Sequence, residues 1–193
     1  NSKGVMLTHR NICSNVMASR KIQKVGVGDR MLSILPLSHT YENTLGLILP
    51  MVDGGCTYYL PQVPTPAVLL PALKKIKPTA MLSVPLIIEK IFRLRIKPKF
   101  TKSPVMKALY GVRPIQKVLH RVAGKKLYKS FGGSLHFFGI GGAKLDGVVE
   151  TFLRDAKFPY AIGYGLTETS PVLAGTSPLK GSWQSTGPAI EGV

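Results

Sequence analysis

Short apolar runs alternate along this chain with longer segments in which apolar residues recur at every third or fourth position. Each short run predicts a strand buried on both faces, because such a strand needs no polar alternation. These strands are expected at residues 31–35, 56–60, 79–84, 135–138 and 160–162. The longer segments predict helices at residues 8–26, 42–52, 65–76, 85–95, 105–128 and 146–155. Together they predict an α/β fold, with a mostly parallel sheet and helices on both faces.

Proline and glycine mark several boundaries of these elements. Pro36 stops the first strand, while Pro66 and Pro85 open helices, because proline is well tolerated at the first helical position. Residues 97–104 contain two prolines and break the helical pattern, so they predict a mobile loop. The tail from Gly175 is rich in glycine, serine and proline and predicts mostly loop.

Size and composition are those of a globular chain. Its 193 residues fit one domain with a sizeable core. The longest uncharged run, residues 54–73, contains four prolines and therefore does not predict a membrane-spanning helix. Cys13 and Cys56 are too few for a disulfide framework, which favours a reduced, cytoplasmic setting.

The formal net charge is +17, and it is concentrated in one part of the chain. Between Lys74 and Lys129 there are 16 Lys or Arg residues and a single acidic residue, Glu89. Three explanations are open: a solvated face whose acidic partners lie elsewhere, contact with an anionic membrane or substrate, and nucleic-acid binding. The first is favoured, and nucleic acid is disfavoured because few aromatic residues interleave with the charges. We expect a basic helical insert at about residues 85–130.

The most informative chemistry lies just after the last predicted strand. Gly163 and Gly165 bracket Tyr164, and Thr167 and Glu168 follow directly. Glycines allow the backbone to approach a ligand closely, and an aromatic ring can stack on a flat heterocycle. A threonine hydroxyl can donate to a phosphate oxygen, and a carboxylate supplies the hard oxygen that Mg²⁺ prefers. This pattern predicts a site for a nucleotide and its metal ion.

A second glycine turn, Gly139 to Ala143, follows the strand at 135–138. A dinucleotide fingerprint is disfavoured, because its third glycine would fall at Lys144. A plain tight turn remains the alternative to a ligand-binding turn. Both glycine turns follow strands, and in parallel sheets ligands bind beyond the carboxyl ends of the strands.

The segment Tyr-Gly-Leu-Thr-Glu-Thr at 164–169 resembles the signature of the adenylate-forming enzymes, which include acyl-CoA synthetases, luciferases and peptide-synthetase adenylation domains. Three other segments resemble motifs of that family in the same order. Residues 1–9 are similar to the second half of its phosphate loop, and 35–42 to its next core motif in the form typical of long-chain fatty acid members. Residues 139–143 resemble the glycine turn that lines the adenine pocket. The four matches span nearly the whole chain.

The resemblance implies roles for individual residues. ATP is expected against Lys3, Gly141, Gly142, Ala143, Gly163, Tyr164, Gly165 and Thr167. Within this set, Lys3 helps to hold the β- and γ-phosphates, and Tyr164 with the backbone of 141–143 holds the base. Glu168 is assigned to Mg²⁺ and Thr167 to the phosphates.

His39 lies beyond the end of the first strand. A lone histidine is more often structural than catalytic, but the resemblance places this one near the acyl carboxylate, where it would position the substrate. Thr167, Glu168 and His39 thus form the expected catalytic set. His120 and His136 have no acidic or cysteine partner at ligand spacing, so no zinc site is predicted.

The resemblance implies a two-step reaction that uses ATP, Mg²⁺ and coenzyme A. A long-chain fatty acid is converted to an acyl-adenylate and then to its coenzyme A thioester. A different acceptor, as in acyl-carrier-protein ligases or luciferase-like oxygenases, stays an alternative. So does a basic module without catalysis that binds nucleic acid or membrane through Lys74–Lys129.

The resemblance also sets an expectation for domain organisation. Residues 1–193 are expected to be part of the large AMP-binding domain of an acyl-CoA synthetase-like fold, without the C-terminal domain. Such a piece is expected to be catalytically inactive alone. The expected location is cytoplasmic, with possible contact between the basic insert and the inner face of a membrane.

Overall fold

A six-stranded sheet organises the computed structural model, which describes residues 4–193. Its strand order is β2-β1-β3-β4-β5-β6. The strands are β1 (Arg30–Ser33), β2 (Cys56–Tyr59), β3 (Ala80–Ser83), β4 (Phe137–Ile140), β5 (Tyr160–Gly165) and β6 (Val172–Gly175). The first five are parallel, and β6 pairs antiparallel with β5. The predicted α/β fold with a mostly parallel sheet is confirmed.

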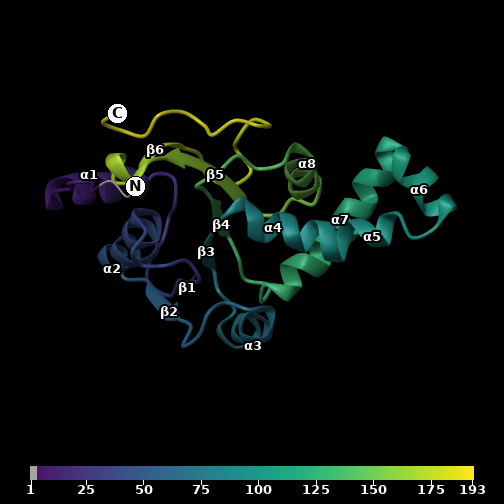
Figure 1. Ribbon diagram of the computed structural model, residues 1–193, viewed down its shortest axis with the longest axis horizontal. Helices are drawn as coiled ribbons and strands as arrows, with labels where there is room; N and C mark the ends of the chain where they lie inside the picture. The colour runs from purple at the N-terminus through teal and green to yellow at the C-terminus, as the bar shows by residue number, and fades with distance from the viewer. Residues whose placement is uncertain (1–3) are drawn as a thin grey trace.

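Helices cover both faces of the sheet. They are α1 (His9–Ser19), the π-helix η1 (Glu42–Ile48), α2 (Leu49–Asp53), α3 (Pro66–Ile76), α4 (Pro85–Ile91), the π-helix η2 (Phe92–Ile96), α5 (Lys97–Phe100), α6 (Pro104–Gly111), α7 (Arg113–Ser130), α8 (Gly147–Asp155) and the 3₁₀ helix η3 (Thr167–Thr169). Figure 1 shows α1 and α2 on one side of the sheet and α3, α4, α7 and α8 on the other.

Successive strand residues supply the two cores that lie on either side of the sheet. Met81 and Phe138 belong to the core beneath α3, α4, α7 and α8, which we call the outer core. Their neighbours Leu82 and Phe137 belong to the core beneath α1 and η1, the inner core. This follows from strand geometry, because consecutive side chains point to opposite faces. The apolar runs of β3 and β4 therefore reflect burial on both sides, whereas the edge strand β2 is largely exposed.

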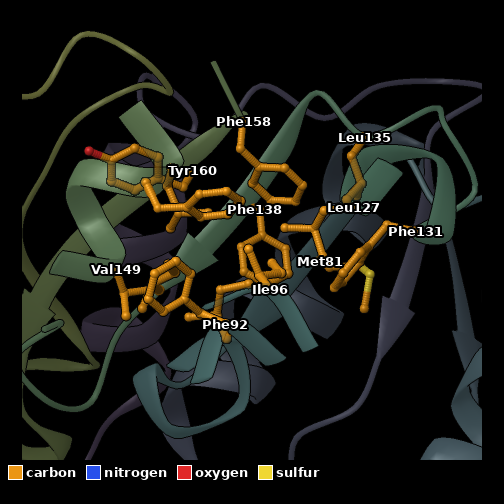
Figure 2. Packing of buried hydrophobic residues seen from close by; sticks show 14 of the residues in the cluster. Met81, Phe92, Ile96, Leu127, Phe131, Leu135, Phe138, Val149, Phe158 and Tyr160 are labelled. Atoms are coloured by element: carbon orange, nitrogen blue, oxygen red, sulfur yellow. The ribbon is translucent and has the colours of Figure 1, made fainter. Parts of the chain in front are cut away.

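Phe138 lies at the centre of the outer core and is fully buried (Figure 2). The rings of Phe131 and Phe158 pack edge-on against it, with centroids 5.5 Å and 5.4 Å away. Edge-to-face contacts of this kind add to the free energy gained by burying the rings. They fix β4 against the loops that follow α7 and α8.

The structure corrects three sequence predictions. Residues 97–104 are not wholly a loop, because Lys97–Phe100 forms helix α5. Phe100 at its end is buried and stacks on Tyr110, with 4.9 Å between ring centroids, so tertiary packing overrides the prolines. The first strand covers Arg30–Ser33 instead of 31–35, and the fourth runs to Ile140 instead of ending at 138. Strand β6 lies before the tail and was not predicted.

Two helical predictions also change. Helix α1 ends at Ser19, although the apolar pattern continues to about residue 26. The predicted helix at 42–52 begins as the π-helix η1. The π-helix is rare, and its single turns inside α-helices are frequently found at functional sites, so η1 is a candidate part of the site.

Residues 85–130, the proposed basic insert, form α4, η2, α5, α6 and α7. Figure 1 shows α5 and α6 at the opposite end of the molecule from α1, on the side of the sheet that α4 and α7 cover. Within residues 4–193, no helix combines the length and the apolar composition needed to cross a bilayer. Cys13 and Cys56 are both unpaired and exposed.

Candidate functional site

A cavity of about 320 Å³ lies on the α1 and η1 side of the sheet, at the carboxyl ends of β4 and β5. Segments far apart in the sequence form its wall: α1, the loop before η1, both strands and the loop that leads to β6. Seven of the predicted site residues line it, namely His39, Gly141, Gly142, Gly163, Tyr164, Gly165 and Thr167. Motifs that are more than 120 residues apart thus meet in one cavity.

Two predicted residues are not on the cavity wall, and a third is not placed. Ala143 is exposed and directly follows the lining residue Gly142. Glu168 is exposed in η3, next to the lining residue Thr167. Lys3 lies outside the described residues, so the structure does not place it.

Glu168 is the carboxylate expected to hold Mg²⁺. In residues 4–193 it forms no ion pair, and no group of three or more His, Cys, Asp or Glu residues is arranged around a possible metal position. A single exposed carboxylate fits Mg²⁺ bound mainly by phosphate oxygens and water, which is the usual arrangement in nucleotide sites. The donor set is therefore compatible with a metal that arrives with the nucleotide.

Tyr164 presents its ring to solvent at the edge of the cavity. It lies on β5 opposite Ala174, and 51% of its surface is exposed. A tyrosine left half-exposed on a cavity wall has a free face for a planar ring to stack on. His39 is likewise exposed, in the turn after β1, where its backbone N–H donates to the carbonyl of Pro36 over 3.0 Å.

The glycines at the site differ in why a side chain would be unfavourable at each position. A Cβ on Gly139 or Gly141 would lie 2.9 Å or 3.2 Å from the nearest atom of the Tyr41 side chain. Gly142 has a positive φ of 86°, which other residues adopt only with strain. The glycine turn after β4 is therefore shaped partly by packing on Tyr41, and only partly free for a ligand.

Gly165 and Gly163 provide a matched pair for a stability test. A Cβ on Gly165 would lie 1.8 Å from the carbonyl oxygen of Pro171, whereas one on Gly163 would meet no atom closer than 3.7 Å. We expect Gly165→Ala to lower the free energy of unfolding by about 2 kcal/mol, because backbone atoms must separate. Gly163→Ala should change it by less than about 0.5 kcal/mol. Urea unfolding measures both, and equal losses would contradict this account.

The loop that carries Thr167 and Glu168 is tied to helix α1 by Asn15. The buried amide of Asn15 donates to the carbonyls of Val172 over 2.7 Å and Thr169 over 3.2 Å. Its oxygen accepts from the backbone N–H of Val172 over 3.2 Å. The sequence analysis did not predict a role for Asn15. Its only sign in the sequence is that Asn15 is a polar residue directly before the apolar pair at 16–17. The clamp fixes η3 while leaving its outward side chains free.

Glu42 is the other residue that the sequence did not single out. Its side chain is completely buried at the start of η1, and neither carboxyl oxygen has a hydrogen-bond partner in the described part of the chain. Burial raises the pKa of this carboxyl to about 7, although the nearby Ser33 hydroxyl opposes the rise. A Cβ on Gly46 would lie 2.7 Å from the carboxyl, so the π-helix needs a glycine there.

Tyr41 connects this buried acid to the cavity. Its ring lines the cavity and packs on the backbone of the turn after β4. Its pKa is raised by burial and by the neighbouring Glu42, so its hydroxyl stays protonated at physiological pH. Among residues 4–193, those that line the cavity include no Asp, Glu, Lys or Arg.

Comparison with known proteins decides the family. The model of the AMP-binding enzyme family matches residues 1–193, which is the whole chain. The chain belongs to the AMP-binding enzyme family. The segments 35–42, 139–143 and 164–169 each contribute residues to the cavity wall, whereas the segment 1–9 lies partly outside the described residues.

Among curated relatives, long-chain-fatty-acid–CoA ligase 2 of Schizosaccharomyces pombe is 29% identical over 185 residues, covering 86% of this chain and 27% of the relative. The peroxisomal long chain acyl-CoA synthetase 6 of Arabidopsis thaliana is 28% identical over 206 residues, covering 98% of this chain and 29% of the relative. The chain therefore spans little more than a quarter of the length of these relatives.

Solved structures share the fold of this family member. The anthranilate CoA ligase AuaEII, in complex with anthranoyl-AMP, superposes with a TM-score of 0.72 at 16% identity, covering 98% of this chain and 32% of that one. The N-terminal domain of FACL13 from Mycobacterium tuberculosis gives a TM-score of 0.72 at 18% identity, covering 99% of this chain and 42% of that one. The expected fold, that of the large domain of an acyl-CoA synthetase, is confirmed.

Proposed function

We propose that this chain forms the adenylating core of an ATP-dependent long-chain fatty acid–CoA ligase. The observation that carries the proposal is the meeting of Tyr164, Thr167, His39 and the glycine turn after β4 in one cavity of an AMP-binding family member. The names of the curated relatives support the fatty acid as substrate and coenzyme A as acceptor. Residues 1–193 would then lie within one adenylating domain.

The first step joins the carboxylate oxygen of the fatty acid to the α-phosphorus of ATP and breaks the bond to pyrophosphate. In our proposal the adenine stacks on Tyr164 and lies against the backbone of Gly141 and Gly142. The hydroxyl of Thr167 donates to phosphate oxygens, which stabilises charge that develops in the transition state. His39 orients the incoming carboxylate at the mouth of the cavity.

Glu168 and Lys3 complete the proposed phosphate site. Mg²⁺, when bound, would neutralise phosphate charge and polarise the phosphorus centre; the carboxylate of Glu168 is the ligand that this chain offers. Lys3 is proposed from sequence alone to contact the β- and γ-phosphates. In the second step the thiolate of coenzyme A attacks the acyl carbon and AMP leaves.

The proposal is tested by calorimetric titration with a non-hydrolysable long-chain acyl-adenylate mimic. We expect Tyr164→Ala to weaken binding about tenfold, because stacking of a base on an aromatic ring contributes about 1 to 3 kcal/mol. Tyr59→Ala is the matched control, since Tyr59 is similarly exposed (47%) but lies on β2, away from the cavity. Equal weakening by both variants, or no binding by the folded chain, would contradict the proposed site.

The metal assignment needs a separate titration. Glu168→Gln should weaken binding of Mg-ATP by about tenfold or more, since one charge-assisted contact to the ion is lost. It should leave binding of the metal-free acyl-adenylate mimic unchanged. A variant that weakens both ligands alike would mean that Glu168 shapes the loop and does not bind the metal.

A further inference from the structure

A second and larger hollow lies on the opposite face of the sheet. It has a volume of about 760 Å³ and is bounded by α3, by α4 with η2, and by α7. Its deep residues, such as Leu73, Leu127 and Phe131, belong to the outer core. The candidate nucleotide cavity instead contacts Leu45 and Phe137 of the inner core. The sheet separates the two sites, so a ligand in one does not touch the other.

Each bounding helix turns an apolar stripe towards this hollow, which we call the outer groove. Its apolar lining includes Leu69 and Leu73 on α3, Ile87 and Ile91 on α4, and Leu119 and Val122 on α7. On each helix these positions are three or four residues apart, as expected for one helical face. Leu86, Leu94 and Val122 are 66%, 69% and 51% exposed, so the stripes continue outward onto the surface. The groove is therefore open and apolar up to its rim.

The rim of the outer groove is cationic. Lys90, Arg95, Lys99 and Lys126 line it, all four are exposed, and none of the residues that line the groove is acidic. Over residues 4–193 these four cations form no ion pair. The neighbouring acids pair elsewhere: Glu89 with Arg93, and Asp155 with Arg113 and His120. An open apolar groove surrounded by unpaired positive charge is complementary to a ligand with acyl chains and negative head groups.

We propose that the outer groove docks on an anionic phospholipid bilayer, with lipid acyl chains against its apolar stripes and head-group phosphates on its rim. A single bound fatty acid would engage one or two cations, whereas the segment from Lys74 to Lys129 presents 16 against one acid. A nucleic acid would satisfy the charge but leave the exposed leucines in water. Apolar insertion and a polybasic patch together are the two signals that stable peripheral binding requires.

The test measures co-flotation of the chain with two kinds of vesicle, pure phosphatidylcholine and equal parts of phosphatidylcholine and phosphatidylserine. The unsubstituted chain should bind the anionic vesicles preferentially. Lys90→Gln with Lys126→Gln should weaken that binding about thirtyfold, because each basic residue near the surface contributes about 1 kcal/mol. Leu86→Ser with Leu94→Ser should weaken it about tenfold or more, and should do so in high salt as well.

Matched controls carry the same changes outside the groove. Lys24→Gln with Lys180→Gln removes two exposed cations from other segments, and Val27→Ser with Met51→Ser removes apolar side chains that are 93% and 69% exposed. Both controls should bind vesicles within about threefold of the unsubstituted chain. Circular dichroism and urea unfolding establish that every variant is folded.

Insertion itself is measured with a tryptophan placed at position 94. Bromine atoms on the acyl chains should quench the added fluorescence of Leu94→Trp but not that of Val27→Trp, each read over the constant signal of Trp183. Three results would overturn the proposal: binding weakened equally by groove and control variants, no quenching at position 94, or duplex DNA bound more tightly than vesicles with the leucine pair having no effect.

Discussion

Replacing Asp155 with alanine is expected to lower the free energy of unfolding by about 3 to 4 kcal/mol. Its carboxylate, at the end of α8, accepts two hydrogen bonds from Arg113, at 2.8 Å and 3.2 Å. It also lies 2.8 Å from Nδ1 of His120, which is almost completely buried. Removing the carboxylate leaves a buried ring N–H without a partner and separates α7 from α8. Removing one partner of a buried hydrogen-bonded network is costly, because the remaining partners lose their hydrogen bonds.

The protonation state of His120 follows from its surroundings. Burial lowers the pKa of the imidazole, while Asp155 opposes that effect. The neutral ring donates from Nδ1 to Asp155, and its Nε2 accepts from the hydroxyl of Tyr110 over 2.8 Å. Because the pKa of His120 is lower in the folded chain, the unfolded chain binds a proton more readily. The contribution of His120 to the free energy of unfolding is therefore highest at neutral pH, and it decreases as the pH falls below the pKa of the unfolded-state histidine.

Urea unfolding at pH 7.5 measures the effect of Asp155→Ala. Asp146→Ala is the matched control at the other end of the same helix, where the side chain caps α8 by accepting from the N–H groups of Val148 and Val149. Loss of that cap should cost only about 1 kcal/mol. If both variants lost the same free energy of unfolding, the contacts of Asp155 with Arg113 and His120 would stabilise the fold no more than the helix cap does. Asp155→Asn, which can still accept from His120, should lie between the two.

Replacing Glu42 with glutamine is expected to raise the free energy of unfolding at pH 8 by about 3 kcal/mol. The pKa of Glu42 is raised from 4.5 to about 7 by burial. Between these values the folded chain keeps a proton that the unfolded chain has lost. The free energy of unfolding of the parent therefore falls as the pH rises from 4.5 to 7, and above pH 7 the full penalty of a buried charge applies. Glutamine cannot ionise, so the variant avoids this penalty.

The measurement compares urea unfolding of the parent and Glu42→Gln at pH 5 and pH 8. At pH 5 the two should differ by less than about 1 kcal/mol, because the parent's carboxyl is protonated and resembles the amide. Glu191→Gln, which removes an exposed carboxylate paired with Lys21, is the control and should show no such pH dependence. A variant that is less stable than the parent at both pH values would mean that Glu42 is held by favourable contacts as an anion.

The sheet could be predicted because most of its strands are short apolar runs bounded by glycine or proline. Strand β6 was not predicted, although Ser170-Pro171 marks a turn before it, because Val172–Gly175 is a short run that is held by antiparallel pairing with β5. Helix α5 was also missed, because Phe100 orders it by stacking on Tyr110 in another helix. In both cases a contact between separate segments, which local pattern does not encode, decided the structure.

The candidate site also contains residues that the sequence predicts and residues that it does not. Tyr164, Thr167 and Glu168 were predictable because they are contiguous and their chemistry is visible in one motif. Asn15 was not, since its partner Val172 is 157 residues away. The sequence also suggested that the turn at 139–143 faces a ligand, whereas Gly139 in β4 and Gly141 after it also make room for Tyr41.

The hydrogen bonds between Asn15 and Val172 join segments 157 residues apart, and this distance affects the order in which the site folds. A contact that closes so long a loop forms late, because the entropy lost in joining distant segments must first be offset by nearer contacts. The outer core can assemble from neighbouring strands and helices before α1 meets the loop that holds Thr167. During synthesis, this loop therefore stays mobile until the chain has emerged past β6, and ligand affinity should appear after compactness in a refolding experiment.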